Sequence, residues 1–262
     1  MSFATIKVER SADGVARLTL ARAEKHNALN IAMIRELTEA ARVLGGDASV
    51  RVVVLSGEGK SFCAGGDLDW MRAQMTKDRA GRMAEAGELA SMLAALDGLP
   101  KPLIGRVHGA AYGGGVGLMA VCDSVFAADT AKFALTEVRL GLIPATIGPF
   151  VVGRIGEAGA RRFMLNARTF DAVTALRLGL VSEVVSGEAL DAAVAAEVSA
   201  MLECAPGAVA AAKALCRHLG RDGGDDQKAW SVAQLADRWE SDEAAEGVEC
   251  FFERREPSWR KG

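Results

Sequence analysis

Two glycine-rich segments, residues 59–68 and 107–123, have the composition of loops that bind an anion. A short apolar run, 50–55 or 103–107, precedes each of them, and a helix-like pattern follows. Glycine allows sharp turns and lets a ligand approach the main chain, and the first N–H groups of a helix are unpaired at the positive end of its dipole. If each turn directs one N–H at the same oxygen, the two form an oxyanion hole made of main chain.

Glu137 has a sequence context that suits proton transfer. It lies in Leu135-Thr136-Glu137-Val138, just before an apolar turn, and this setting predicts that its side chain is buried. Burial disfavours the charged form of a carboxyl group and raises its pKa, which is useful for general acid–base chemistry. The alternative is a surface acid that pairs with Arg139.

Two nucleotide-binding motifs are excluded by single residues. Gly59-Lys60-Ser61 has the end of a phosphate-binding P-loop, but Val54 stands where that motif needs its first glycine. Leu118 stands where the dinucleotide motif G-x-G-x-x-G needs its last glycine.

The elements that must position these groups alternate between strands and helices. A hairpin is predicted over 6–9 and 15–20, and Asn30 suits the N-cap of an amphipathic helix that ends at the next pair of glycines. Residues 67–97 are predicted to be helical with one polar break. Further strands are expected at 125–127, 132–135 and 179–185. This order indicates an α/β fold.

The composition changes near residue 188, where alanine-rich helical segments begin. A glycine-rich loop is expected at 220–225, and no strand pattern follows Val185. We therefore divide the chain into a core, residues 1–187, and a C-terminal α-helical region, residues 188–262.

The composition excludes several other classes of protein. Half of the 262 residues are hydrophobic, which is enough for a sizeable core, and the net charge of −3 without a basic stripe argues against a nucleic-acid surface. The five cysteines form no C-x-x-C pair and the three histidines have no metal-ligand spacing, so we expect reduced thiols and no metal site. The sequence shows neither a signal-peptide core nor a membrane span, and a cytoplasmic protein is expected.

Three motifs in register resemble the crotonase (enoyl-CoA hydratase/isomerase) superfamily. They are Ser-Phe-Cys-Ala-Gly-Gly-Asp-Leu at 61–68, His-Gly-Ala-Ala-Tyr-Gly-Gly-Gly at 108–115, and Phe-Ala-Leu-Thr-Glu-Val-Arg-Leu-Gly-Leu-Ile-Pro at 133–144. The resemblance extends over nearly the whole chain. It implies a crotonase-type spiral of ββα units with a C-terminal helical region that makes trimer contacts, in a homotrimer or a dimer of trimers. It also implies an acyl-CoA thioester as substrate, with no cofactor apart from the coenzyme A of that substrate.

The resemblance also implies the residues of the site. The motif positions give the N–H groups of Ala64 and Gly115 as the oxyanion donors and Glu137 as the catalytic acid. The turn near Lys25, His26 and Ala28 is expected to contact the adenine end of coenzyme A, although Lys25 is equally a solvated charge. The other expected substrate contacts are the main chain of Ala145 and the residues of the two glycine-rich turns, which are Gly65, Gly66, Asp67, Leu68 and Gly114.

The second glutamate of the family's hydratases is replaced here by Gly117. The motifs look most like bacterial hydratases of branched enoyl-CoA esters, such as 3-methylglutaconyl-CoA in leucine breakdown, so hydration of a 2-enoyl-CoA is expected. The alternative is an enoyl-CoA isomerase that uses Glu137 as its single proton shuttle. A non-catalytic RNA-binding member is disfavoured by the net charge.

Two features of the expected acyl site stay open at this point. Trp70, Met71 and Met75 either line an acyl pocket or belong to the ordinary core. Whether a cation such as Arg72, Arg82 or Arg106 reaches a distal carboxylate of the substrate is also open. We also expect that the missing side chain at Gly117 leaves space and removes a negative charge, which would suit a substrate that carries its own carboxylate.

Overall fold

The computed structural model describes residues 3–221 and 227–260, with the side chain of residue 221 left out. Most of the loop expected at 220–225 lies outside these residues. Ten strands form two sheets in the described part of the chain. The larger sheet has the order β1-β2-β3-β5-β7-β10, and the smaller has the order β4-β6-β8-β9.

The larger sheet begins with the predicted hairpin and continues in parallel. β1 (Ile6–Arg10) is antiparallel to β2 (Val15–Leu20), which confirms the hairpin. The strands that follow in parallel are β3 (Val52–Gly57), β5 (Leu103–Val107), β7 (Ser124–Ala128) and β10 (Glu183–Val185).

The smaller sheet consists of short strands, several of which the sequence pattern did not indicate. They are β4 (Ser61–Cys63), β6 (Ala110–Tyr112), β8 (Lys132–Ala134) and β9 (Phe170–Asp171), and only β9 is antiparallel to its neighbour. Along the chain, β3, β5 and β7 of the larger sheet are each followed directly by a strand of the smaller sheet and then by helix. This arrangement is the expected spiral of ββα units.

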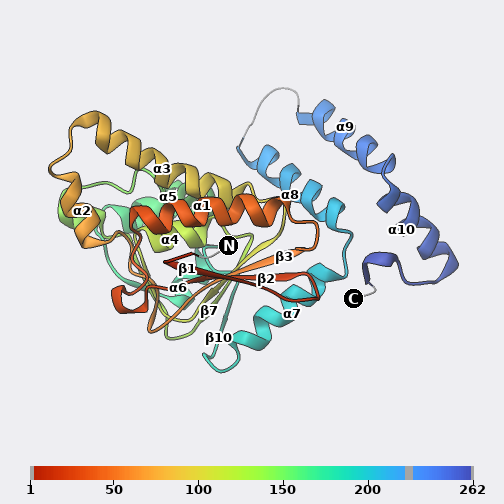
Figure 1. Cartoon of the computed structure of the whole chain (residues 1–262), viewed down its shortest axis with the longest axis horizontal. Coiled ribbons are helices and arrows are strands. Elements are labelled where there is room, and N and C mark those ends of the chain that lie inside the picture. Colours follow the sequence, from red (N-terminus) through yellow and green to blue (C-terminus); the bar gives the residue numbers. More distant parts are fainter. Residues whose placement is uncertain (1–2, 222–226, 261–262) are drawn as a thin grey trace.

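Helices cover both faces of the larger sheet (Figure 1). α1 (Ile31–Gly46) and α3 (Arg79–Asp97) pack side by side on one face, and Asn30 caps α1 as predicted by accepting a 2.9 Å hydrogen bond from the Met33 N–H. α7 (Leu190–Leu202) covers the other face. Successive side chains of a strand point to opposite faces. Val53 therefore belongs to the cluster under α1, whereas Val54 packs with α7.

The helices nearest to the two glycine-rich turns are short. α2 (Leu68–Gln74) and α3 together confirm the predicted helical segment and its polar break. α4 (Gly114–Ala120) follows the second turn. Two single 3₁₀ turns, η1 (Ala23–Lys25) and η2 (Glu137–Leu140), flank the same region.

The second half of the chain is joined to this core by α5 (Gly148–Met164) and α6 (Ala172–Arg177). α5 begins at Gly148 and has a break at Gly156, whose φ is 70°.

Only helices follow β10 in the described residues, as predicted. After α7 come α8 (Pro206–Arg221), α9 (Gln227–Trp239), α10 (Asp242–Glu253) and η3 (Ser258–Arg260). The domain boundary at residue 187 stays a prediction, and α7, which lies beyond it, packs on the sheet through Leu190, Val194 and Val198. α9 and α10 extend away from the sheets (Figure 1).

No single helix among the described residues is long and apolar enough to cross a membrane. α7 and α8, which are bent relative to each other, have the length and composition of a membrane span only when they are taken together. A cytoplasmic location stays a prediction. Of the five free cysteines, Cys63 and Cys122 are buried in the core, and burial raises the pKa of each thiol to about 12.

Candidate active site

A cavity of about 800 Å³ lies where the two glycine-rich turns meet α2, α3 and η2. Its wall is mostly apolar. Trp70, Met71 and Met75 belong to this wall, which agrees with the interpretation that they line a pocket. The charged residues of its lining are Glu137, Arg72 and Arg82. The arrangement fits an apolar ligand that meets one acid and two cations.

The main chain of Gly66 faces this cavity at the end of the first turn. Leu29 donates its N–H to the Gly65 carbonyl (2.7 Å) and accepts the Asp67 N–H (2.9 Å), so these two groups point toward Leu29. In extended chain, successive residues direct their N–H groups to opposite sides. The N–H of Gly66 therefore points away from Leu29, and no hydrogen bond occupies it within the described residues.

Gly114 presents the second unpaired N–H of the cavity. It is the first residue of α4, and the first N–H groups of a helix have no partner within it. The two turns touch, because a β-carbon on Gly114 would lie 3.9 Å from the Cα of Gly65. Gly66 and Gly114 thus place two free main-chain donors at one wall of the cavity.

The donors expected from the motif positions, Ala64 and Gly115, are not at the cavity wall. The N–H of Ala64 donates to the His26 carbonyl at 2.9 Å. Gly115 is buried against β4, where a β-carbon would lie 2.4 Å from the Cys63 carbonyl oxygen. The structure corrects the expected pair, since one N–H is already used and the other glycine serves close packing.

Glu137 is half-buried at the start of η2 and lines the cavity, as its sequence context predicted. Its Oε2 is buried and has no hydrogen-bond partner among the described residues, and the other oxygen lies against Gly113. Burial raises the pKa of the Glu137 carboxyl, and a hydrogen bond from its own main chain opposes this effect. The alternative pairing with Arg139 is wrong, because Arg139 donates instead to the Ala167 carbonyl at 2.7 Å.

The space expected at Gly117 is filled by Ile147. A β-carbon on Gly117 would lie 2.5 Å from Cγ2 of Ile147 and 3.0 Å from its Cβ. Ile147 lines the cavity, whereas Gly117 is buried beneath it. The expectation of open space at Gly117 is therefore wrong. The apolar side chain of Ile147 lies where the family's second acid would be.

Ala145 is another expected contact whose main chain is occupied. Its N–H donates to the Ile143 carbonyl at 2.8 Å, so it has no donor left for a water. The neighbouring residues Pro144 and Thr146 line the cavity in its place.

The residues expected at the adenine end lie beside the first turn but outside the cavity lining. The Nζ of Lys25 is 3.3 Å from Asp69, and the Nδ1 of His26 is 3.1 Å from the Ser61 hydroxyl. The Ala28 carbonyl accepts a hydrogen bond from Arg22 at 2.6 Å. Their contact with coenzyme A stays a prediction.

Asp67 and Leu68 have structural settings at the start of α2. The Asp67 side chain caps α2 by accepting the N–H groups of Asp69 and Trp70, and it forms a largely buried 2.9 Å ion pair with Arg22. Desolvation works to raise the Asp67 pKa, but the hydrogen bonds from Arg22 and the main chain outweigh it and lower that pKa. Leu68 is 76% exposed and does not line the cavity.

Of the three arginines considered for a distal carboxylate, only Arg72 and Arg82 line the cavity. Arg106 is held by Asp191 at 2.5 Å. No group of His, Cys, Asp and Glu in residues 3–221 and 227–260 has an arrangement that could hold a metal ion.

Two residues that shape the site were not predicted from the sequence. Leu29 fixes the Gly66 turn through main-chain bonds between segments far apart in the chain. Ile147 meets Gly117 from a different ββα unit. Both contacts depend on the tertiary fold, so neither produces a local motif.

Comparison with known proteins shows the family to which the chain belongs. The family described as enoyl-CoA hydratase/isomerase matches residues 10–262. The chain is 38% identical over 205 residues to an enoyl-CoA hydratase of Alternaria alternata, ACTT6, with 78% of this chain and 67% of that protein covered. It is 32% identical over 262 residues to a probable enoyl-CoA hydratase of Mycobacterium tuberculosis, echA8, with 99% of both chains covered.

Solved structures show the same architecture. A crystal structure of an enoyl-CoA hydratase from Shewanella pealeana has a TM-score of 0.94 at 37% identity, covering 98% of this chain and 96% of that one. Pseudomonas aeruginosa AtuE has a TM-score of 0.93 at 37% identity, covering 98% and 100%. The fold is the α/β crotonase fold, and the chain belongs to the enoyl-CoA hydratase/isomerase family.

Proposed function

We propose that the chain is an enoyl-CoA hydratase that adds water across the C2–C3 double bond of a 2-enoyl thioester. The observation that carries this proposal is the placement of the unpaired Glu137 carboxylate in the same cavity as the free N–H groups of Gly66 and Gly114. The named relatives from Alternaria alternata and Shewanella pealeana support the same activity.

Each group has one role in this mechanism. The two N–H groups bind the thioester oxygen and stabilise the negative charge that collects on it, a contribution of about 10²–10³ in rate for each donor. Glu137 accepts a proton from water as the water oxygen bonds to C3, and it then returns a proton to C2. The reaction consumes one water and needs no redox partner, and coenzyme A enters only as part of the substrate.

The test is hydration of crotonyl-CoA, followed as the loss of the absorbance of the conjugated thioester and confirmed by identifying 3-hydroxybutyryl-CoA. Wild-type protein is compared with Glu137→Gln, which keeps the size of the side chain but removes the base. Product formation that is absent in wild type, or equal in the two proteins, contradicts the proposal.

An enoyl-CoA isomerase is a second candidate, favoured by the contact between Gly117 and Ile147. Because an isoleucine stands at the position of a second acid, Glu137 is the only acid that lines the cavity within the described residues. A single carboxylate is enough to remove a proton from C4 of a 3-enoyl-CoA and to deliver one to C2. Incubation with 3-hexenoyl-CoA distinguishes the two reactions, because an isomerase accumulates the 2-enoyl ester faster than any hydration product.

As the specific substrate, we propose a branched ester that carries its own carboxylate, such as 3-methylglutaconyl-CoA. Arg72 and Arg82 support it, because both line the cavity and neither forms an ion pair with an acid in the described part of the chain. Wild type should then have a higher kcat/KM for this ester than for crotonyl-CoA, and Arg72→Ala or Arg82→Ala should reduce that ratio. Arg79→Ala, on α3 but outside the cavity lining, is the matched control.

A homotrimer, or a dimer of trimers, is the assembly that we propose. Large apolar side chains on α9 and α10 are exposed in the single chain, among them Leu235, Trp239, Phe251 and Phe252. Burial of such a surface in a partner subunit is the expected use of an apolar patch of this kind. Light scattering during gel filtration gives the number of subunits, and Phe251→Asp should lower it.

A further inference from the structure

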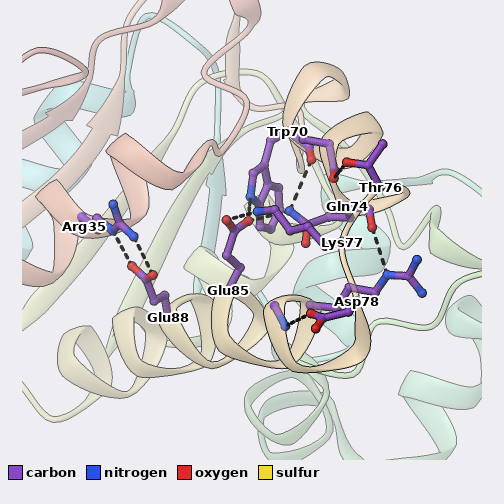
Figure 2. A network of polar contacts seen from close by, with 11 residues as sticks. Arg35, Trp70, Gln74, Thr76, Lys77, Asp78, Glu85 and Glu88 are labelled. Atoms are coloured by element: carbon purple, nitrogen blue, oxygen red, sulfur yellow. Dashed lines mark hydrogen bonds and ion pairs between the residues drawn. The ribbon is translucent and has the colours of Figure 1, made fainter.

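One carboxylate on α3 holds the helix that forms a wall of the cavity (Figure 2). Oε2 of Glu85 accepts hydrogen bonds from the indole N–H of Trp70 at 2.6 Å and from Nε2 of Gln74 at 2.5 Å. Oε1 of the same group pairs with the ammonium of Lys77. Its pKa lies below the ordinary value, chiefly because of the hydrogen bond from Lys77, so the group is charged at neutral pH.

The three donors come from α2 and from the turn after it. Other polar contacts attach the same segment, since the Asp67 side chain caps the first turn of α2 and Arg82 of α3 donates to the Gln74 and Met75 carbonyls. No residue of α2 is buried, and Leu68 and Met75 at its two ends are 76% and 80% exposed. Trp70 is half-buried and packs against the hydrophobic core, whereas the two ends of the helix are open to solvent. A hydrogen bond to a charged group is stronger than one between neutral groups, and the bonds of Glu85 are the ones that reach the Trp70 and Gln74 side chains on the cavity wall.

α2 forms the acyl wall of the cavity, whereas the reacting groups are anchored elsewhere. Trp70, Met71, Arg72 and Gln74 of this helix all line the cavity. Gly66 is held by the main-chain bonds of its neighbours to Leu29, and Glu137 lies on η2. A change in the orientation of the Trp70 and Gln74 side chains would thus alter the space for the acyl chain, while the main chain around Gly66 keeps its bonds to Leu29 and Glu137 keeps its place on η2.

We propose that Glu85 is a positioning residue that sets the acyl-chain selectivity of this enzyme by fixing Trp70 and Gln74 on the cavity wall. It does not touch the reacting atoms. A longer acyl chain buries more apolar surface against the wall that Trp70 and Gln74 form, so its affinity should depend more on Glu85 than that of a short chain. This inference rests on the proposed acyl-CoA substrate.

The experiment compares the binding of butyryl-CoA and decanoyl-CoA by calorimetry, and the hydration of the corresponding 2-enoyl esters, in wild type and in Glu85→Ala. The variant should bind decanoyl-CoA about tenfold more weakly, because the side chains that contact the long chain are no longer held in place, and should bind butyryl-CoA nearly as wild type does. KM for the long enoyl ester should rise in parallel, while kcat for crotonyl-CoA should stay within about twofold.

Two further variants separate positioning from a general loss of structure. Glu85→Gln keeps an oxygen that accepts from Trp70 and Gln74, so it should recover most of the selectivity. Glu88→Ala removes the bidentate pair of Glu88 with Arg35 of α1, one turn along the same helix and away from the cavity lining (Figure 2). It should leave the ratio of the two affinities unchanged.

An equal loss for both esters in Glu85→Ala, or the same change of ratio in Glu88→Ala, overturns the proposal. The saturated esters do not react, so their binding tests Glu85 even if no enoyl ester is hydrated. A failure of the proposed hydratase activity is therefore distinguishable from a failure of this inference.

Discussion

Gly117 and Ile147 share one space: a β-carbon on the glycine would lie 2.5 Å from Cγ2 of the isoleucine. The glycine is thus required by packing, and the isoleucine fills the position of a second acid with apolar surface. Because Ile147 also lines the cavity, this contact links the buried helix α4 to the wall that a substrate meets.

The contact predicts a strong coupling between the two positions. Gly117→Ala should lower the free energy of unfolding by about 1–3 kcal/mol, since a crowded core tolerates no added methyl group. Ile147→Ala should cost less stability in that background than in wild type. Denaturant unfolding of the four proteins measures the coupling. Gly87→Ala on α3, where nothing lies within 4 Å of the new methyl group, should be stabilising and is the control.

Glu137→Gln should lower kcat by at least ~10²-fold, because the proton acceptor is lost. Binding of the coenzyme A ester should persist, since the two main-chain donors and the apolar wall are unchanged. Stopped-flow kinetics and calorimetry measure the two effects. Turnover close to that of wild type would remove Glu137 from the catalytic role.

The pH dependence of both rate and stability should report the burial of Glu137. Its native pKa lies above the ordinary value of 4.5, so kcat/KM should fall with decreasing pH through a limb centred above that value. The native state binds the extra proton, and the free energy of unfolding should therefore decrease as the pH rises from the unfolded value through the native one. Denaturant curves for wild type and Glu137→Gln across this range test the sign. A smaller decrease in wild type than in the variant contradicts it.

Gly66→Pro should reduce kcat by about 10²–10³, because proline removes the N–H that faces the cavity. Gly66→Ala keeps that N–H, and its new methyl group would meet the flexible Met71 side chain at 3.3 Å and the Trp70 ring at an ordinary contact distance of 3.8 Å. It should retain activity within a few-fold and serves as the control. Equal activities of the two variants would place the oxyanion donor at another residue.

The sequence predicted the larger sheet and most helices well, because their apolar runs and caps are local. The hairpin over β1 and β2 and the Asn30 cap are examples. In the smaller sheet, β8 was predicted within 132–135, whereas β4, β6 and β9 were missed because strands of two or three residues are too short to show an alternating pattern.

The candidate site was predicted to the correct turns but not to the correct atoms. Motif position indicated Ala64 and Gly115, whereas the N–H groups that face the cavity belong to Gly66 and Gly114. The direction of a main-chain N–H depends on dihedral angles and on partners such as Leu29 and His26, which the sequence does not specify. Glu137 was predicted correctly to line the site, because the apolar residues beside it in the sequence indicate that its side chain is buried.

The burial of Cys63 should protect its sulfur from alkylation by a reactive ligand in the site. A conjugated thioester is an electrophile that alkylates thiolates, and Cys63 lies two residues before Gly65 in the first glycine-rich turn. With a pKa of about 12, its thiolate population at pH 7 is about 10⁻⁵, so the protein should not be alkylated there by its own proposed substrate. Labelling with an electrophilic probe should instead modify the exposed Cys204 and Cys216, and mass spectrometry of the digested protein would show which sulfur has reacted.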